Sequence, residues 1–165
     1  MEAFSRASSC YSRMLGISHA KTANVIYCMA LIYKDRAEKS SDLTDNISKI
    51  FHQGNLDING ELSIDDLEVL LSKLFSTVDL SLCSGPQTIV ALLLEVSETE
   101  NLADVGTLNE IEFDSICRRC LLLVAEGYFR TAAASFEAQH GKDYSFARQA
   151  AVFALSCSQH PAPSA

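Results

Sequence analysis

The sequence predicts an all-α protein. Its 165 residues include no tryptophan and only three prolines, and the prolines are far apart in the chain. Apolar residues recur three and four positions apart through most of the chain, which is the spacing of one buried face of a helix. The length suits a single domain, or two small lobes, with a substantial hydrophobic core.

Composition and charge narrow the class of protein. Apolar residues make up 48% of the chain and charged residues 21%, which is typical of a soluble globular protein rather than a disordered one. The net charge of −8 argues against nucleic acid as a partner, because phosphate binding needs a surplus of Lys and Arg. The longest apolar run, Val25 to Leu31, is far shorter than the about 20 residues of a membrane-spanning helix.

Residues 1–17 are rich in serine and carry Arg6 and Arg13 against one acid, Glu2. This composition is typical of a mitochondrial transit segment, and the alternative is a short N-terminal helix of a cytoplasmic protein. A secretory signal is disfavoured because no long apolar run follows the charges. We favour the cytoplasmic alternative and keep the mitochondrial one open.

A long helix is predicted from Ser18, as its cap, to about Lys39, and its apolar surface exceeds what a solvent-facing helix needs. A polar connector is expected at 37–42, and the next helix begins at Ser41 or Asp42. The buried faces of the two helices consist of Val25, Ile26, Met29, Ile32 and Tyr33, and of Leu43, Ile47, Ile50 and Phe51.

Residues 55–66 have the pattern of a cation-binding loop. Oxygen-bearing side chains occupy alternate positions, a glycine allows a sharp turn, and a carboxylate stands at the twelfth place. These residues are Asn55, Asp57, Asn59, Gly60 and Asp66. After the loop, Ser63 with Asp66 predicts another helix start. The apolar face of that helix consists of Leu67, Leu70, Leu71, Leu74 and Phe75.

This helix-loop-helix resembles an EF-hand, and a second such unit follows it. A linker at 76–85 leads to a helix that is predicted to start at Pro86. In the next loop, at about 101–112, Gly106, Leu108 and Glu112 correspond to Gly60, Leu62 and Asp66. Asn109 and Glu112 form a predicted helix cap. The resemblance implies that Leu62 and Leu108 meet in a short two-stranded bridge.

The resemblance assigns metal ligands to the first loop: side chains of Asn55, Asp57 and Asn59, the backbone carbonyl of Glu61, Ser63 directly or through water, and the carboxylate of Asp66. At the first place of the loop, Asn55 is neutral where EF-hands normally have Asp. At the twelfth place, Asp66 is shorter than the Glu that EF-hands normally have. The resemblance therefore implies weak Ca²⁺ binding, at about 10⁻⁵ M or weaker, or Mg²⁺. The alternative is a metal-free loop held by turns of its Asn and Asp side chains.

The second loop is predicted to be degenerate, because Ala103 and Val105 at its third and fifth places offer no side-chain oxygen. The EF-hand pair is expected to span 41–125, after an N-terminal helical segment at 1–40. A C-terminal helical extension is predicted at 126–157, with a break at Gly141. An unstructured tail is expected at 158–165.

The six cysteines lie mostly in apolar periodic stretches, where a thiol packs as a small hydrophobe. Cys117 and Cys120 have C-x-x-C spacing, yet no second pair or histidine accompanies them, so helix packing is favoured over zinc binding. No constellation of catalytic residues is recognised, and an enzyme is not expected.

The expected function is that of a subunit or adaptor, with weak divalent-cation binding in the first loop. The expected partner is a protein, most simply a helix of a larger assembly. The alternative is a calcium-dependent sensor, which would open a helix pair and expose a groove for a target helix.

Overall fold

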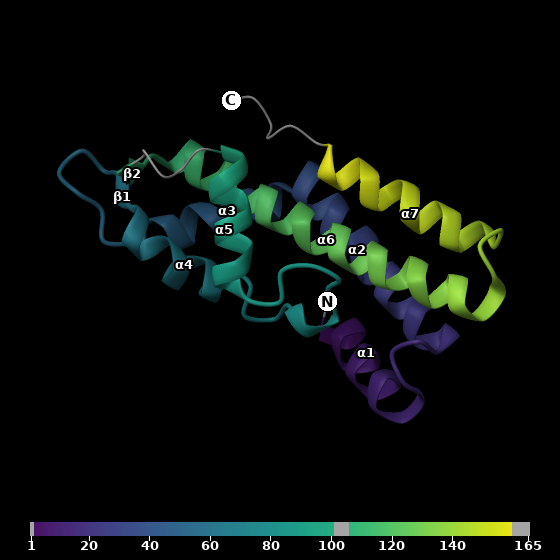
Figure 1. The fold of residues 1–165 in the computed structure, drawn as a ribbon. Coiled ribbons are helices and arrows are strands. Elements are labelled where there is room, and N and C mark those ends of the chain that lie inside the picture. Colours follow the sequence, from purple (N-terminus) through teal and green to yellow (C-terminus); the bar gives the residue numbers. More distant parts are fainter. Residues whose placement is uncertain (1, 101–105, 160–165) are drawn as a thin grey trace.

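The computed structural model describes residues 2–100 and 106–159, and the predicted all-α class is confirmed in them (Figure 1). The helices are α1 (Glu2–Leu15), α2 (Ala20–Lys39), α3 (Ser41–Phe51), α4 (Leu67–Leu74), α5 (Ile89–Glu100), α6 (Glu110–His140) and α7 (Ser145–Ser158). Two strands, β1 (Leu62–Ser63) and β2 (Thr107–Leu108), and two 3-10 turns, η1 (Ile64–Asp66) and η2 (Leu80–Leu82), complete the described elements.

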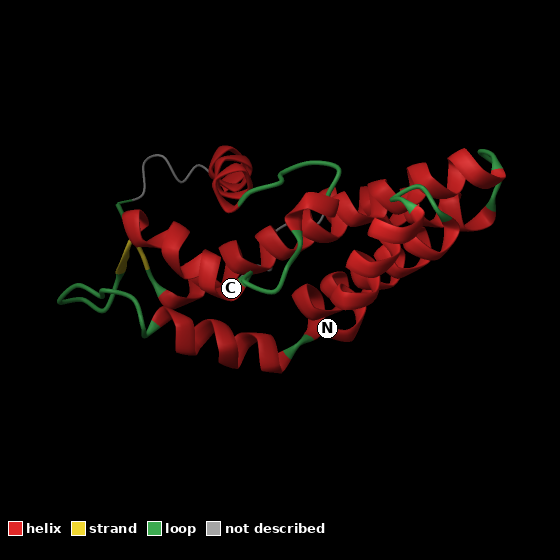
Figure 2. Ribbon diagram, turned by 90° about the horizontal axis from the view of Figure 1, so that it is seen from below, coloured by secondary structure: helices red, strands yellow, loops and turns green. Residues whose placement is uncertain are grey.

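The molecule is built around α6, the 31-residue helix that runs through both of its halves (Figures 1 and 2). Over its C-terminal part, α6 packs against α2 and α7, and α1 lies on α2. Over its N-terminal part it packs against α3 and α5, and α4 contacts both of these helices. Residues 116–129 of α6 are buried without exception, as expected for a helix with neighbours on several sides.

One half of the molecule, residues 41–112, is called the lobe below. It contains α3, α4, α5, both strands and the start of α6. The strands are antiparallel, with Leu62 opposite Leu108 and Ser63 opposite Thr107. Both leucines are buried, so the bridge closes over the core of the lobe. The predicted meeting of Leu62 and Leu108 is confirmed.

Three predicted helix ends need correction. The cap of α2 is His19 rather than Ser18, because its Nδ1 accepts the N–H of Lys21 at 3.2 Å. The expected connector at 37–42 shrinks to Ser40, whose N–H bonds to α2 while its side chain caps α3. Because Ser40 both ends α2 and caps α3, a connector of several residues is not needed.

The third correction concerns α5, which begins at Ile89 and not at Pro86. The side chain of Thr88 accepts the N–H of Ala91 at 3.1 Å, so this threonine caps the helix.

Two other predicted helix ends, both of α6, are confirmed. Asn109 and Glu112 form a reciprocal cap at the start of α6, and Gly141, with φ of +87°, follows its end.

The C-terminal half also follows the prediction closely. Helix α6 continues without a break through residue 126, and the last helix, α7, begins at Ser145, after the predicted break at Gly141. The expected tail lies mostly outside the described residues, which end at Gln159. Among the helices of the described ranges, none is both long and apolar enough to cross a membrane.

Candidate functional site

The first loop projects from the end of the lobe as a narrow turn (Figure 1). Leu56 pairs with Leu62 in an isolated bridge, and the N–H of Asp57 donates to the carbonyl of Glu61 at 2.9 Å. Gly60 has φ of +78°, a conformation that side chains other than glycine disfavour, so the predicted need for glycine at the turn is met. The loop is therefore a small hairpin with its tip at residues 58–60.

The Asp57 carboxylate organises this turn from inside. Its Oδ1 accepts the backbone N–H of Asn59 at 2.8 Å and that of Glu61 at 2.9 Å. These hydrogen bonds, above all the one from Glu61, lower the pKa of Asp57 below its ordinary value. Asp57 therefore stays ionised at neutral pH and satisfies two loop donors that would otherwise be left to water.

The backbone carbonyl of Glu61, which the resemblance assigns to a metal, also has a partner within the protein, because it accepts the N–H of Asp57. The carboxylate of Glu61 accepts the hydroxyl of Thr107 on β2. In residues 2–100 and 106–159, no group of three or more His, Cys, Asp or Glu side chains is placed to hold a metal. In this arrangement the loop is closed by its own hydrogen bonds. The ligand set Asn55, Asp57, Asn59, Glu61 and Asp66 remains a prediction.

Asp57→Ala is expected to loosen the loop while leaving the helices folded. The backbone N–H groups of Asn59 and Glu61 lose their shared acceptor, so their amide hydrogen exchange should become faster, and the circular dichroism of the helices should persist. Asp65→Ala is the matched control, because it also removes one exposed carboxylate from this segment. Unchanged exchange at residues 59 and 61 in Asp57→Ala would contradict the bracing role.

Acid should have the same effect on the wild-type loop. Because the folded-state pKa of Asp57 lies below the ordinary value of 3.8, its stabilisation is complete above that pH. It is lost as the pH falls through the folded-state pKa. Exchange at residues 59 and 61 should then approach that of Asp57→Ala.

The second loop can be compared with the first only in part. Residues 101–105, which include the predicted third and fifth places Ala103 and Val105, lie outside the described residues. The described end of this loop joins the first one through β1 and β2. The carboxylate of Glu112, the predicted counterpart of Asp66, accepts the N–H of Asn109 at 2.9 Å and so forms part of the helix cap.

The end of α2 lies against the interior of the lobe. Tyr33 and Arg36 of α2 line a small void together with residues of α3, of the end of α4 and of α6, among them Leu43, Leu74, Phe75, Cys117 and Leu121. This void measures about 20 Å³, which is room for about one water molecule. The space between α3, α4 and α6 is therefore closed on the side of α2 and has no room for a partner's side chain.

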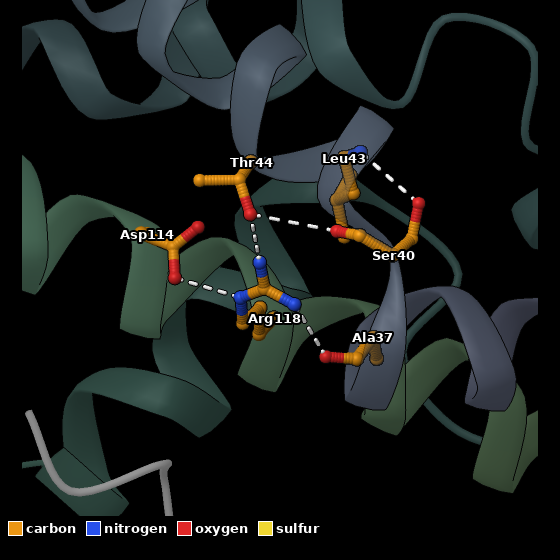
Figure 3. Close-up of polar contacts among 6 residues, drawn as sticks. All are labelled: Ala37, Ser40, Leu43, Thr44, Asp114 and Arg118. Atoms are coloured by element: carbon orange, nitrogen blue, oxygen red, sulfur yellow. Dashed lines mark hydrogen bonds and ion pairs between the residues drawn. The ribbon is translucent and has the colours of Figure 1, made fainter.

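Arg118 ties α2 and α3 to α6, as Figure 3 shows. Its Nη1 donates to the carbonyl of Ala37 at 2.8 Å, near the end of α2. Its Nη2 donates to Thr44 on α3 at 2.7 Å, and its Nε to Asp114, one turn earlier on α6, at 2.7 Å. Arg118 is 9% exposed, so one buried guanidinium holds the junction of three helices.

Sequence reasoning missed Arg118 and its neighbour Arg119. Arg119 is also buried and donates to the carbonyl of Cys157 at the end of α7, at 3.0 Å. The available signal was a pair of arginines inside an apolar stretch of a helix that is buried all round. Buried charges need partners, and arginine can serve several acceptors at once.

The cysteines flanking this arginine pair are confirmed as packing residues. Cys117 and Cys120 are buried, and all six cysteines are free thiols. Burial raises the pKa of Cys120 to about 12 and that of Cys117 well above its ordinary value. Both thiols are therefore protonated at neutral pH, and neither is poised as a nucleophile.

The chain matches no protein-family model, no curated protein and no solved structure.

Proposed function

We propose that this protein is a constitutive subunit or adaptor that binds a protein partner without needing a metal ion. Its lobe resembles a pair of EF-hands, and the first loop of that pair acts as a brace with weak divalent-cation binding at most. The observation that carries the proposal is the closure of the space between α3, α4 and α6, where the end of α2 leaves a void of only about 20 Å³. A sensor must open its helices to bind a target, and here that space is closed by the chain itself.

The hydrogen bonds of the first loop support a role that does not depend on metal. Asp57 satisfies the loop's backbone donors, and Glu61 links the loop to β2 through Thr107. A loop that is already closed gains little further order from an ion. Cation binding would then be weakly coupled to the shape of the lobe.

Exposed apolar side chains on the lobe support a protein partner. Ile58 is fully exposed at the tip of the first loop, Val69 on α4 is 57% exposed, and Ile111 at the start of α6 is 63% exposed. Single exposed apolar residues are common on soluble proteins. Because the interior of the lobe is closed, exposed side chains of this kind, which also include Val90 and Leu94 on α5, are what the lobe offers for apolar contacts.

Calcium should change the stability of the purified chain very little. A thermal melt in 1 mM EDTA and one in 1 mM CaCl₂ are expected to give midpoints within about 2 °C of each other, because a site with a dissociation constant of about 1 mM or weaker adds at most about 0.4 kcal/mol at this calcium concentration. Isothermal calorimetry should show little or no heat below millimolar Ca²⁺. A midpoint that rises by about 10 °C in calcium would contradict the metal-independent role.

The partner should also be retained without metal. Tagged protein isolated from its own cells is expected to bring down the same partner in EDTA and in calcium. Loss of the partner in EDTA would favour the second candidate function, a calcium-dependent sensor. The twelve-residue spacing of the first loop is the observation in favour of that candidate. A sensor of this kind would require the end of α2 to move away from the lobe.

A further inference from the structure

A second hollow lies on the outer surface of the lobe, between α3 and the start of α6. It has a volume of about 260 Å³ and is lined by Thr44, Ile47, Ser48, Glu110, Ile111 and Asp114. We call it the α3–α6 groove. It is smaller than the about 300–1,000 Å³ typical of small-molecule pockets, so it suits one or two side chains of a larger partner.

The α3–α6 groove combines an apolar surface with carboxylates. Ile47 is buried, while Ile111 is 63% exposed and open to a partner. Glu110 and Asp114 are one helical turn apart, so they lie on the same side of α6. No Lys or Arg is among the residues that line this hollow.

The two carboxylates of the groove differ in exposure. The Oδ2 of Asp114 accepts from Arg118, and its Oδ1 is buried and has no hydrogen-bond partner among the described residues. Asp114 therefore gives the groove its charge rather than a free acceptor. The side chain of Glu110 is 44% exposed, with the Nε2 of His52 3.7 Å from its Oε2, so Glu110 is the carboxylate that a partner can reach.

The negative charge of the whole lobe favours a partner with positive charge. Residues 41–112 contain 14 acidic residues and two basic ones, a formal charge of −12, although the chain as a whole has −8. The rest of the chain therefore has a small positive charge. Such a field attracts basic segments and repels nucleic acid and anionic membranes.

We infer that the α3–α6 groove docks a basic amphipathic segment of a partner protein. An apolar side chain of that segment packs on Ile111, and a Lys or Arg one helical turn away donates to Glu110 and is attracted by the charge of Asp114. This inference rests on the proposed function, because it names the surface and the chemistry through which the subunit holds its partner. The surface differs from the interior space that the end of α2 closes.

The test uses a fluorescein-labelled 14-residue peptide of Leu and Lys at helical spacing, with binding followed by fluorescence anisotropy. The full chain is kept in EDTA and 150 mM salt, so that a metal cannot contribute and weak long-range attraction is screened. We expect the Leu/Lys peptide to bind. A peptide with Glu in place of Lys should not bind, and a scrambled Leu/Lys peptide without helical spacing should bind more weakly.

Two variants locate the binding surface. Ile111→Lys places a positive charge in the groove and should weaken binding about tenfold, as loss of a central interface contact does. Val152→Lys on α7 is the matched control, since Val152 is 61% exposed and lies outside the lobe. It makes the same change in net charge and should leave binding within about twofold.

Three results would overturn the inference: no binding of the Leu/Lys peptide, equal binding by Ile111→Lys and the wild type, or equal weakening by both variants. The last result would mean attraction by net charge alone. Circular dichroism of each variant verifies that it is folded. If the groove fails this test while the cellular partner is retained in EDTA, only the docking surface is wrong and the proposed function stands.

Discussion

Replacement of Arg118 by methionine is expected to lower the free energy of unfolding by about 3–5 kcal/mol, the usual cost of removing one partner from a buried ion pair. Asp114 would lose its cation, and the carbonyl of Ala37 and the hydroxyl of Thr44 would lose a donor. Methionine fills most of the same volume, so the loss reports on polar contacts rather than on a cavity. Urea unfolding followed by circular dichroism measures the change.

Two further variants make the Arg118 result specific. Arg118→Lys keeps the positive charge but cannot serve three acceptors in the planar geometry of a guanidinium, so it should fall between the wild type and Arg118→Met. Arg148→Met removes an exposed arginine from α7 and should cost no more than about 0.5 kcal/mol. If Arg118→Met also stays within that range, the guanidinium does not hold the junction of α2, α3 and α6.

Phe129→Ala is expected to cost about 3–5 kcal/mol of unfolding free energy, which is the usual range for truncating a buried phenylalanine. Phe129 on α6 is completely buried, and its ring centroid lies 5.7 Å from that of Tyr27 on α2 and 5.4 Å from that of Phe153 on α7. The ring thus fills the space where three helices meet. Urea unfolding again gives the magnitude.

Phe146 provides the control for Phe129. It belongs to the same aromatic cluster, 6.2 Å from Tyr27, but it is 44% exposed. Phe146→Ala should therefore cost about 1 kcal/mol, because the truncated site stays open to water and leaves no closed cavity. If Phe146→Ala lowers the free energy of unfolding as much as Phe129→Ala does, the closed packing around Phe129 adds no stability of its own.

Local signals in the sequence predicted most helix positions well. The pair Asn109 and Glu112 marks the start of α6 and Gly141 marks its end, because a cap and a glycine stop act within one turn of the chain. The errors at His19, Ser40 and Thr88 were also local. In each case another nearby residue satisfied the same free backbone donors.

The candidate site could be predicted only in part. Comparing the loops around Gly60 and Gly106 located the contact between Leu62 and Leu108, because the two loops share one pattern of residues. The pattern could not show that the carboxylates of Asp57 and Glu61 accept hydrogen bonds from within the protein. Whether an oxygen faces a cation or an N–H depends on backbone geometry, which a string of residue types does not specify.

The positions and ends of the helices and the pairing of Leu62 with Leu108 could be predicted from the residues, because these features follow from neighbouring residues and from a repeated pattern. The packing of the end of α2 against the lobe, and the contacts of Arg118 with residues 74 and 81 positions away, could not be predicted in this way. Contacts over such separations depend on how whole helices pack, and the free energy of that packing is shared among many side chains. For this reason the first loop was recognisable from its residues, whereas the closed space between α3, α4 and α6 was not.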